Sequence, residues 1–143
     1  TALLADSASA GNTDILNNPI TLTAAGTPTI RSTNTGATLA LNGTITNNTA
    51  TLTFNSVGDT QMFGVIGSGS GGITKTGAGT LTLNNTNTYT GATTINVGSI
   101  TLGIANAIGS GSAVTLANAA GALLNLNGFS DVIGSLAGGG ALG

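Results

Sequence analysis

Aliphatic residues alternate with threonine, asparagine or small residues along most of the chain, with a period of two. The alternation is clearest in six short segments, residues 20–23, 38–42, 51–55, 80–84, 99–102 and 113–116. Such alternation is typical of β-strands with one buried face, and the β-branched threonine suits the other face. Clusters of glycine, asparagine, serine and aspartate separate the segments and predict turns. No stretch has a helical pattern with caps, so the sequence predicts an all-β chain.

A longer period of about 20 residues also runs through the chain. Large apolar residues recur at successive spacings of 19, 19, 22, 20, 19, 22 and 18 residues. The members of this series are Leu3, Leu22, Leu41, Phe63, Leu83, Leu102, Leu124 and Leu142. Three short strands and their corners fill one coil of about 20 residues in a β-solenoid. The period therefore favours a solenoid with about 20 residues per coil.

An antiparallel sandwich or barrel is the alternative use of the same strands. Asn42-Gly43 stands between apolar strand residues and is a strong signal for a type I′ hairpin. Asn127-Gly128 is a second such signal. Aromatic residues make up only 3% of the chain and charged residues only 4%, whereas sandwiches usually have bulky cores and charged outer faces. The composition thus favours the solenoid over the sandwich.

The composition also excludes several classes of function. The 143 residues include no His, Cys or Trp. The charged residues are Asp6, Asp14, Arg31, Asp59, Lys75 and Asp131. Without His or Cys, the usual zinc, haem, iron–sulfur and thiol chemistries have no ligands or nucleophiles. A net charge of −2 with two cations gives no basic surface for nucleic acid or for an anionic membrane.

Length and hydropathy predict one folded unit over residues 1–143. The chain is 40% hydrophobic, which is enough apolar surface for collapse, so we do not expect disorder. No apolar run reaches the roughly 20 residues of a membrane-spanning helix. No charged segment followed by an apolar core opens the chain, so no signal peptide is predicted, although Ala8-Ser9-Ala10 has the small residues of a cleavage site.

Two patterns that could carry chemistry have simpler interpretations. Gly67, Gly69 and Gly72 fit the phosphate-binding pattern G-x-G-x-x-G, which requires a following helix. The residues after Gly72 are strand-like, so we interpret these glycines as a flexible corner. The four scattered aspartates lack the fixed spacing of calcium-binding repeats, and no His or Glu supports them as glycosidase carboxylates. We therefore expect no enzyme, no catalytic residue, no metal site and no cofactor.

Residues 71–103 carry the most specific signal, the sequence GGITKTGAGTLTLNNTNTYTGATTINVGSITLG. It closely resembles the autotransporter-associated β-strand repeat of the passenger regions of bacterial autotransporters and related surface proteins. That family has a Gly-Gly-aliphatic-Thr-Lys-Thr-Gly opening, a Thr-Leu-Thr-Leu strand, an Asn-Thr-Tyr-Thr-Gly turn and a Thr-aliphatic-Asn strand. The matching positions, with a downstream continuation, are Gly72, Lys75, Gly77, Gly79, Leu81, Leu83, Asn87, Tyr89, Gly91, Ile95, Leu102, Leu126, Gly128 and Phe129.

The resemblance implies a right-handed parallel β-helix that is exported through the outer membrane and displayed or released outside the cell. It also implies a scaffold without catalytic residues of its own. The family's membrane anchor is not among these residues, so we expect either a piece of a longer solenoid or a stacking subunit. The predicted partners are further solenoid coils, from the same chain or from identical copies stacked head to tail. The sequence names no host or cell-surface ligand.

The sequence also predicts where a lysine, a tyrosine and three asparagines place their side chains. Lys75 is expected to lay its aliphatic stem along the solenoid and to keep its ammonium in water. Tyr89 is interpreted as a turn residue whose ring covers an apolar corner. Asn42, Asn84 and Asn125 each follow a strand leucine, which predicts a hydrogen-bonded stack of asparagines.

Threonines two residues apart predict a regular outward array of hydroxyl and methyl groups. They are Thr21/Thr23, Thr44/Thr46, Thr51/Thr53, Thr80/Thr82 and Thr86/Thr88/Thr90. Three functions are consistent with these features. A rod-like extracellular scaffold for display or adhesion is favoured. A self-assembling extracellular filament is the second hypothesis, and an ice- or glycan-binding surface built on the threonines is the third.

Overall fold

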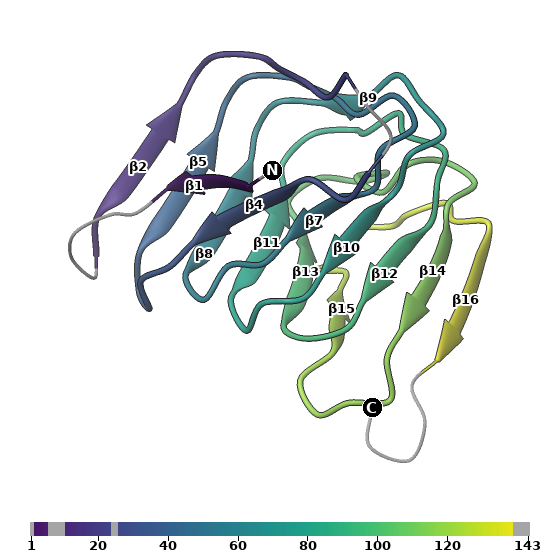
Figure 1. Cartoon of the computed structure of the whole chain (residues 1–143). Helices are drawn as coiled ribbons and strands as arrows, with labels where there is room; N and C mark the ends of the chain where they lie inside the picture. Colours follow the sequence, from purple (N-terminus) through teal and green to yellow (C-terminus); the bar gives the residue numbers. More distant parts are fainter. Residues whose placement is uncertain (1, 6–10, 24–25, 139–143) are drawn as a thin grey trace.

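The chain folds as a parallel β-solenoid, seen from the side in Figure 1. The computed structural model describes residues 2–5, 11–23 and 26–138. These residues form strands, turns and bends and include no helix. Every pair of neighbouring strands in the described residues is parallel, so the chain winds in one direction and returns to the same sheet once per coil. The predicted parallel solenoid is confirmed.

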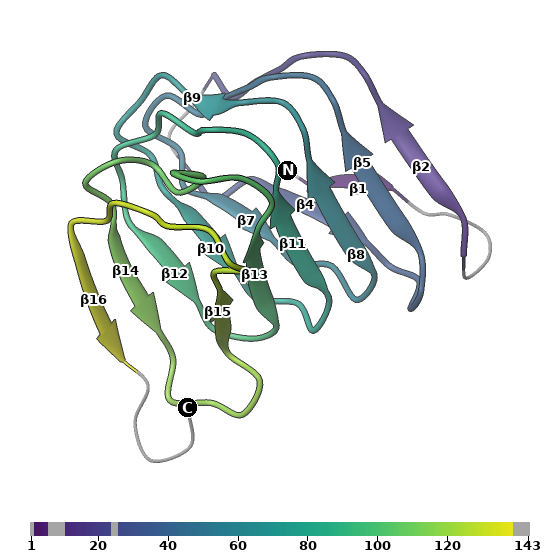
Figure 2. The same ribbon diagram turned by 180° about the vertical axis from the view of Figure 1, so that it is seen from behind.

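Two long sheets form the sides of the solenoid. The first sheet has the order β1-β4-β7-β10-β12-β14-β16. Its strands are β1 (Ala2–Ala5), β4 (Thr29–Ser32), β7 (Leu52–Phe54), β10 (Ile73–Lys75), β12 (Thr93–Ile95), β14 (Ala113–Leu116) and β16 (Ser135–Gly138). The second sheet, which Figure 2 shows from behind, has the order β2-β5-β8-β11-β13-β15. Its strands are β2 (Thr13–Leu16), β5 (Thr38–Leu41), β8 (Asp59–Met62), β11 (Thr80–Leu83), β13 (Ser99–Leu102) and β15 (Leu123–Asn125).

The third side has regular strands only in the first coils. These are β3 (Ile20–Thr21), β6 (Ile45–Thr46) and β9 (Ile66–Gly67). Beyond β9 the third side continues through single hydrogen bonds, such as the 2.9 Å bond from the Thr88 N–H to the Ile66 carbonyl. A column of residues therefore runs along this side through Ile45, Ile66, Asn87 and Ile108.

The length of a coil is given by the spacing of paired residues. Paired residues are 20 positions apart between β10 and β12, and 19 between β11 and β13. The first coils are longer, with 27 positions between β1 and β4 and 25 between β2 and β5. The predicted period of about 20 residues is thus confirmed for the central coils.

The sandwich alternative is wrong. Asn42-Gly43 does not join paired strands, because β5 belongs to the second sheet and β6 to the third side. Asn127 and Gly128 do have the two positive φ angles of a type I′ turn, +49° and +80°. They nevertheless link β15 to β16, which belong to different sheets. The asparagine–glycine chemistry produces the turn, but the strands on either side pair with other coils.

Inward-facing side chains stack in columns that cross the coils. One column of the second sheet consists of Leu16, Leu41, Met62, Leu83 and Leu102. The predicted series shares three members with it, but Met62 replaces Phe63, whose side chain is 44% exposed. Leu124 aligns with Ile100 in the adjacent column, and Leu22 follows β3 on the third side. Leu142 and the segment Ala8-Ser9-Ala10 lie outside the described residues.

Candidate interaction surfaces and the interior hydrogen bonds

Lys75 lies inside the solenoid, where its side chain is only 1% exposed. It takes a place in an inward column of the first sheet, between Phe54 below and Ile95 above. Its ammonium donates a hydrogen bond to the Gly77 carbonyl. The predicted cation with its ammonium in water is therefore wrong. The strand alternation Ile73-Thr74-Lys75 already placed Lys75 on the same side as the buried Ile73, and that signal identifies its position better than its charge does.

Burial lowers the pKa of Lys75 from 10.5 to about 8, although Asp59 acts in the opposite direction. The cause is desolvation, because an ammonium loses its hydration in an apolar interior. At neutral pH the solenoid thus encloses a cation that donates a hydrogen bond to the Gly77 carbonyl. Burial of this charge lowers the stability of the folded chain, because one hydrogen bond replaces only part of the lost hydration.

Tyr89 closes a corner of the interior and is fully buried. Its hydroxyl lies 2.8 Å from Thr93 Oγ1, which lies 2.9 Å from Ser112 Oγ in the next coil. Ser112 Oγ in turn donates to the Gly91 carbonyl at 2.8 Å. Burial raises the pKa of Tyr89 to about 12. The interpretation of Tyr89 as a covered corner residue agrees with this burial, and the hydroxyl chain joins two coils from inside.

Asn87 uses its side chain as a substitute peptide group between three coils. Its Oδ1 accepts a 2.7 Å hydrogen bond from the Ile66 N–H of the coil below. Its Nδ2 donates to the Ala107 carbonyl of the coil above at 2.6 Å, and to the Asn85 carbonyl at 3.1 Å. In a regular parallel ladder, backbone groups would make the bonds to both neighbouring coils. The asparagine of the Asn-Thr-Tyr-Thr-Gly turn thus continues the ladder where the third side has no strand.

Replacing Asn87 with alanine is expected to lower the free energy of unfolding by about 2 kcal/mol, because a buried N–H and a buried carbonyl lose their partners. Urea unfolding followed by circular dichroism measures the loss. Asn96→Ala is the matched control, because Asn96 is exposed on the outer side of the solenoid, and it is expected to change stability by less than about 0.5 kcal/mol. Equal losses in the two variants would contradict the role of Asn87.

The remaining motif residues divide between the interior and the last corner. Leu81, Leu83, Ile95 and Leu102 are fully buried in the columns. Gly72, Gly77, Gly79 and Gly91 pass so close to the backbone of a neighbouring coil that an added Cβ would lie 2.0–2.5 Å from it. By contrast, Leu126 is 47% exposed and Phe129 38% exposed on either side of Gly128. Most motif residues thus pack one coil against the next. The structural role assigned to the motif from the sequence stays a prediction.

The predicted asparagine stack does not form. Asn42 Nδ2 donates to Asn17 Oδ1 at 2.8 Å, in the coil below. The next position in that column is Phe63, which separates Asn42 from Asn84. Asn125 Oδ1 instead accepts from the N–H of Asn127 within its own turn. A continuous stack requires asparagine at one register position in successive coils. Asn42 and Asn84 share a column but are two coils apart, and Asn125 pairs with Thr101 in another column.

One outward column of the first sheet consists of threonine in five successive coils. Its members are Thr29, Thr53, Thr74, Thr94 and Thr115. Of the threonines predicted to form an array, only Thr53 belongs to this column. In the second sheet, Thr82 pairs with Thr101, but the same outward column also contains Gln61 and Ala40. Among the described residues of these two sheets, the column through Thr53 and Thr74 is therefore the regular outward array of threonines.

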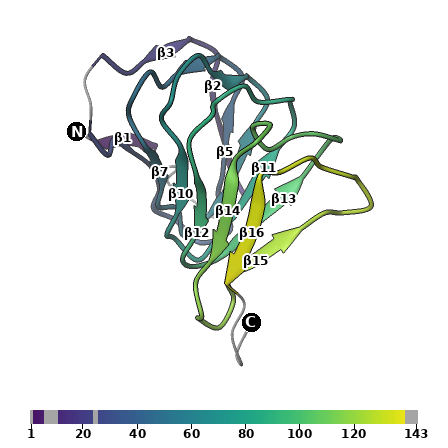
Figure 3. The same cartoon turned by 90° about the vertical axis from the view of Figure 1, so that its right-hand side faces the viewer.

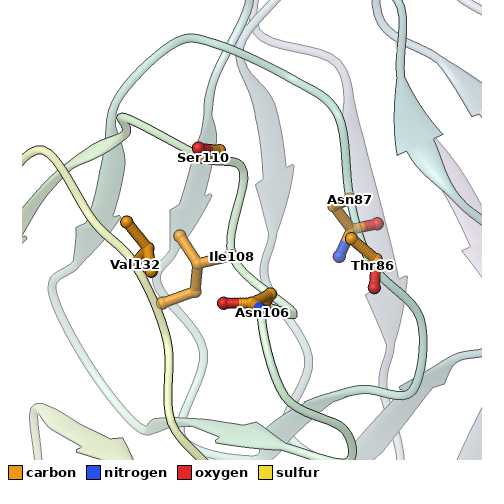
Figure 4. Close-up of a pocket in the computed structure, with 6 residues that line it drawn as sticks. All are labelled: Thr86, Asn87, Asn106, Ile108, Ser110 and Val132. Carbon is orange, nitrogen blue, oxygen red and sulfur yellow. The ribbon is translucent and has the colours of Figure 1, made fainter.

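A shallow hollow of about 280 Å³ opens on the third side (Figure 4). Its lining comes from three successive coils and consists of Thr86, Asn87, Asn106, Ile108, Ser110 and Val132. Asn87 is committed to the coil-to-coil hydrogen bonds described above. The hollow thus exposes hydroxyl groups, one amide group and an aliphatic rim. These groups make its surface neutral.

The glycine-rich corner and the acidic residues form no recognisable ligand site among the described residues. Gly67 ends β9 and Gly72 directly precedes β10, so no helix follows the glycine-rich corner, in keeping with its interpretation as a turn. Across residues 2–5, 11–23 and 26–138, no three His, Cys, Asp or Glu side chains gather in a metal-binding cluster. The same residues contain no helix long and apolar enough to cross a membrane.

Comparison with known proteins supports the motif. Residues 73–102 match the model of the family described as passenger-associated-transport-repeat. A stretch of 75 residues is 49% identical to the "Adhesin BmaC autotransporter" of Brucella suis biovar 1 (strain 1330). The aligned stretch makes up 52% of this chain but only 2% of that protein, so the chain spans a small part of the relative's length. No solved structure resembles the chain at a significant level.

Proposed function

Because residues 73–102 are a repeat of autotransporter passenger regions, we propose that the chain is a structural module of a longer extracellular solenoid, serving as a rod-like scaffold for display or adhesion. A passenger repeat of this kind is secreted or displayed at the cell surface. The observation that carries the proposal is the burial of the motif residues: Leu81, Lys75 and Asn87 all lie inside the solenoid and pack or hydrogen-bond there. Such a module adds length to a rigid rod, because each coil contacts only the neighbouring coils.

Adhesion is the more specific of the two proposed roles. The relative in Brucella suis is called an adhesin, and the side surfaces of this chain carry mostly hydroxyl and amide groups, with few charges such as Arg31 and Asp59. A neutral polar surface favours weak contacts repeated along a rod, since several coils can engage together and add their affinities. The ligand of such contacts is set by the outward residues, while the inward residues only maintain the rod.

A self-assembling filament is a second candidate, supported by the parallel pairing of every coil with the next, which a further copy could continue. Among the described residues, β1 and β2 are the outermost strands of the two long sheets on one side, and β16 and β15 are the outermost strands on the other. Unpaired strand edges are templates for further strands. The threonine column supports the third candidate, an ice- or glycan-binding surface, for which thermal hysteresis and a glycan array are the discriminating measurements.

Surface display tests the scaffold. The chain is inserted between an outer-membrane anchor and a distal epitope, and the cells are treated with proteinase K. We expect the intact chain to keep the epitope accessible and to be cleaved on the order of ten times more slowly than a Leu81→Asp variant, because Leu81 is fully buried. Equal cleavage rates for the two forms, or an inaccessible epitope in both, would contradict the proposed scaffold role.

Binding of the same cells to host cells tests adhesion separately. Thr74 and Thr94 lie next to each other in the outward threonine column. Replacing both with lysine is expected to leave protease resistance unchanged and to lower cell binding if this face makes the contact. Unchanged cell binding would exclude the threonine face while leaving the scaffold in place.

A further inference from the structure

Phe63 carries an exposed aromatic ring on the side of the solenoid. It directly follows β8, and β5 and β11 pair with β8 on its two edges (Figure 2). Its side chain is 44% exposed, whereas Phe54 and Tyr89 are fully buried. Because a coil lies on each edge of β8, the ring is exposed sideways, at the end of a strand of the second sheet, whose strands β11 and β13 lie to the right in Figure 3. The exposure of Phe63 is therefore a property of a central coil.

Phe63 interrupts a column of asparagines. The backbone register places Asn17, Asn42, Phe63 and Asn84 at one position in four successive coils. Where two asparagines are adjacent in this column they bond to each other, since Asn42 Nδ2 donates to Asn17 Oδ1 at 2.8 Å. The Phe63 ring makes no such bond with the amides on either side of it. A break of this kind in a regular pattern is expected at functional positions, because it gives up local stability.

Amide groups occupy the register positions around Phe63. Asn84 Nδ2 is buried and has no hydrogen-bond partner in the described part of the chain, which leaves a polar group uncompensated. Asn42 is exposed, and its Oδ1 takes no part in the bond to Asn17. Gln61 lies two residues before Phe63 and is partly exposed on the same side of the strand. An exposed ring and amides with free hydrogen-bonding capacity therefore share one part of the surface.

Phe63, Asn42, Gln61 and Asn84 form the Phe63 corner, whose chemistry matches a neutral saccharide. A sugar ring has a face of C–H groups, which packs on an aromatic ring, and hydroxyl groups around its edge. Amides both donate and accept hydrogen bonds, as hydroxyl groups do. The four residues carry no charge, and the charged residue of this strand, Asp59, lies at the other end of β8. The corner therefore offers no cation to pair with a phosphate or a carboxylate.

We propose that the Phe63 corner binds a neutral saccharide, with the ring as a platform for the C–H face of the sugar and the amides as partners of its hydroxyl groups. Unlike the threonine column, this corner combines an apolar contact with hydrogen-bonding groups, as ligand sites usually do. The inference rests on the proposed adhesive role and names its place and its ligand class. A single shallow contact is weak, so adhesion draws on many copies of the chain on one cell.

A glycan array tests the proposal with the purified full chain, biotinylated and held on streptavidin so that weak contacts add. We expect binding to neutral oligosaccharides of glucose, galactose or N-acetylglucosamine, without preference for sialylated or sulfated ones. Saturation-transfer difference NMR with a bound oligosaccharide then identifies the contact. Irradiation of the aromatic protons is expected to transfer saturation to the C–H protons of the sugar, because the ring of Phe63 is the contacting group.

Three variants locate the site. Phe63→Asn restores an asparagine to the column, so it is expected to keep or raise the urea midpoint of unfolding while saccharide binding falls at least about tenfold, because the aromatic anchor is lost. Phe63→Trp keeps an aromatic platform and is expected to keep the binding. Val97→Ala is the matched control, because Val97 is 40% exposed at another corner, and it is expected to change nothing. Circular dichroism checks that each variant is folded.

The outcomes separate this site from the proposed scaffold. Binding of anionic probes alone, binding of no oligosaccharide, or equal binding by Phe63→Asn and the unaltered chain would overturn the saccharide site, and unchanged resistance to proteinase K would show that the scaffold stands without it. Displayed on cells, Phe63→Asn is expected to lower binding to host cells as well. Loss of saccharide binding with unchanged binding to host cells would keep the site but overturn its part in adhesion.

Discussion

Replacing Gly98 with alanine is expected to lower the free energy of unfolding by about 4 kcal/mol, a large effect for a single methyl group. Gly98 has a φ of +72°, a conformation that costs an L-residue about 1 kcal/mol. Its added Cβ would also lie 2.3 Å from the Gly77 carbonyl oxygen and 2.9 Å from Lys75 Nζ. Overpacking against fixed backbone adds up to about 3 kcal/mol. Urea unfolding followed by circular dichroism measures the loss.

Gly111→Ala is the matched control for this prediction. Gly111 has a φ of +80°, nearly the same as that of Gly98, but an added Cβ there would meet no atom within 4 Å. Its replacement is expected to cost only about 1 kcal/mol, the backbone term alone. The difference between the two variants therefore measures how tightly the coils are stacked. Similar losses at both positions would show that the close contact contributes nothing.

The strand pattern was the part of the fold most readable from the sequence. In β11, Leu81 and Leu83 face inward and are fully buried, while Thr80 and Thr82 are partly exposed, as the alternation predicts. Alternation succeeds because each coil has one apolar interior and one solvent side. The direction of pairing followed instead from the repeat period and the family motif. The Asn-Gly rule predicted antiparallel hairpins because it specifies a turn and does not specify which strands pair across it.

The register between coils could not be read from the sequence alone. Paired residues are 19 to 27 positions apart in different coils, so a series built on a constant period drifts between columns. Phe63 entered the predicted series although its neighbour Met62 faces inward and is fully buried. Asn87 belonged to the recognised motif, but its bonds to Ile66 and Ala107 depend on that register. Local patterns identify strands, whereas the contacts between coils require the corners to be placed.

Lys75 was misplaced for a different reason. Its strand position predicted an inward side chain, and its charge predicted an outward one. Charged groups are rarely buried because desolvation is costly, so the second rule usually prevails. Here the absence of a side chain at Gly98 leaves space beside the ammonium, whose distance to an added Cβ there would be 2.9 Å. The Gly77 carbonyl supplies an acceptor. The glycines of the motif thus make the interior position of the lysine possible.

The buried ammonium is expected to make the chain more stable as the pH rises above 8. The pKa of Lys75 is about 8 in the folded chain and 10.5 when unperturbed. Between these values the unfolded chain binds more protons than the folded chain, so the free energy of unfolding increases with pH. The full difference corresponds to about 3 kcal/mol, of which about 2 kcal/mol is gained by pH 9.5. Above pH 10 the buried Tyr89, with its pKa of about 12, acts in the opposite direction, so the measurement ends below that pH.

Lys75→Met tests whether this residue causes the pH dependence. Methionine has a similar length and fills the column between Phe54 and Ile95 without a charge. The variant is expected to be more stable than the unaltered chain at pH 7, by about 2 kcal/mol, because the relief of desolvation exceeds the lost hydrogen bond to Gly77. Its urea midpoint is expected to stay constant from pH 7 to about 9.5, since no lysine titrates there. Arg31→Met, which removes an exposed cation, is expected to keep the rise. A methionine variant that is less stable at pH 7 and still gains stability with pH would mean that the ammonium is not the group responsible.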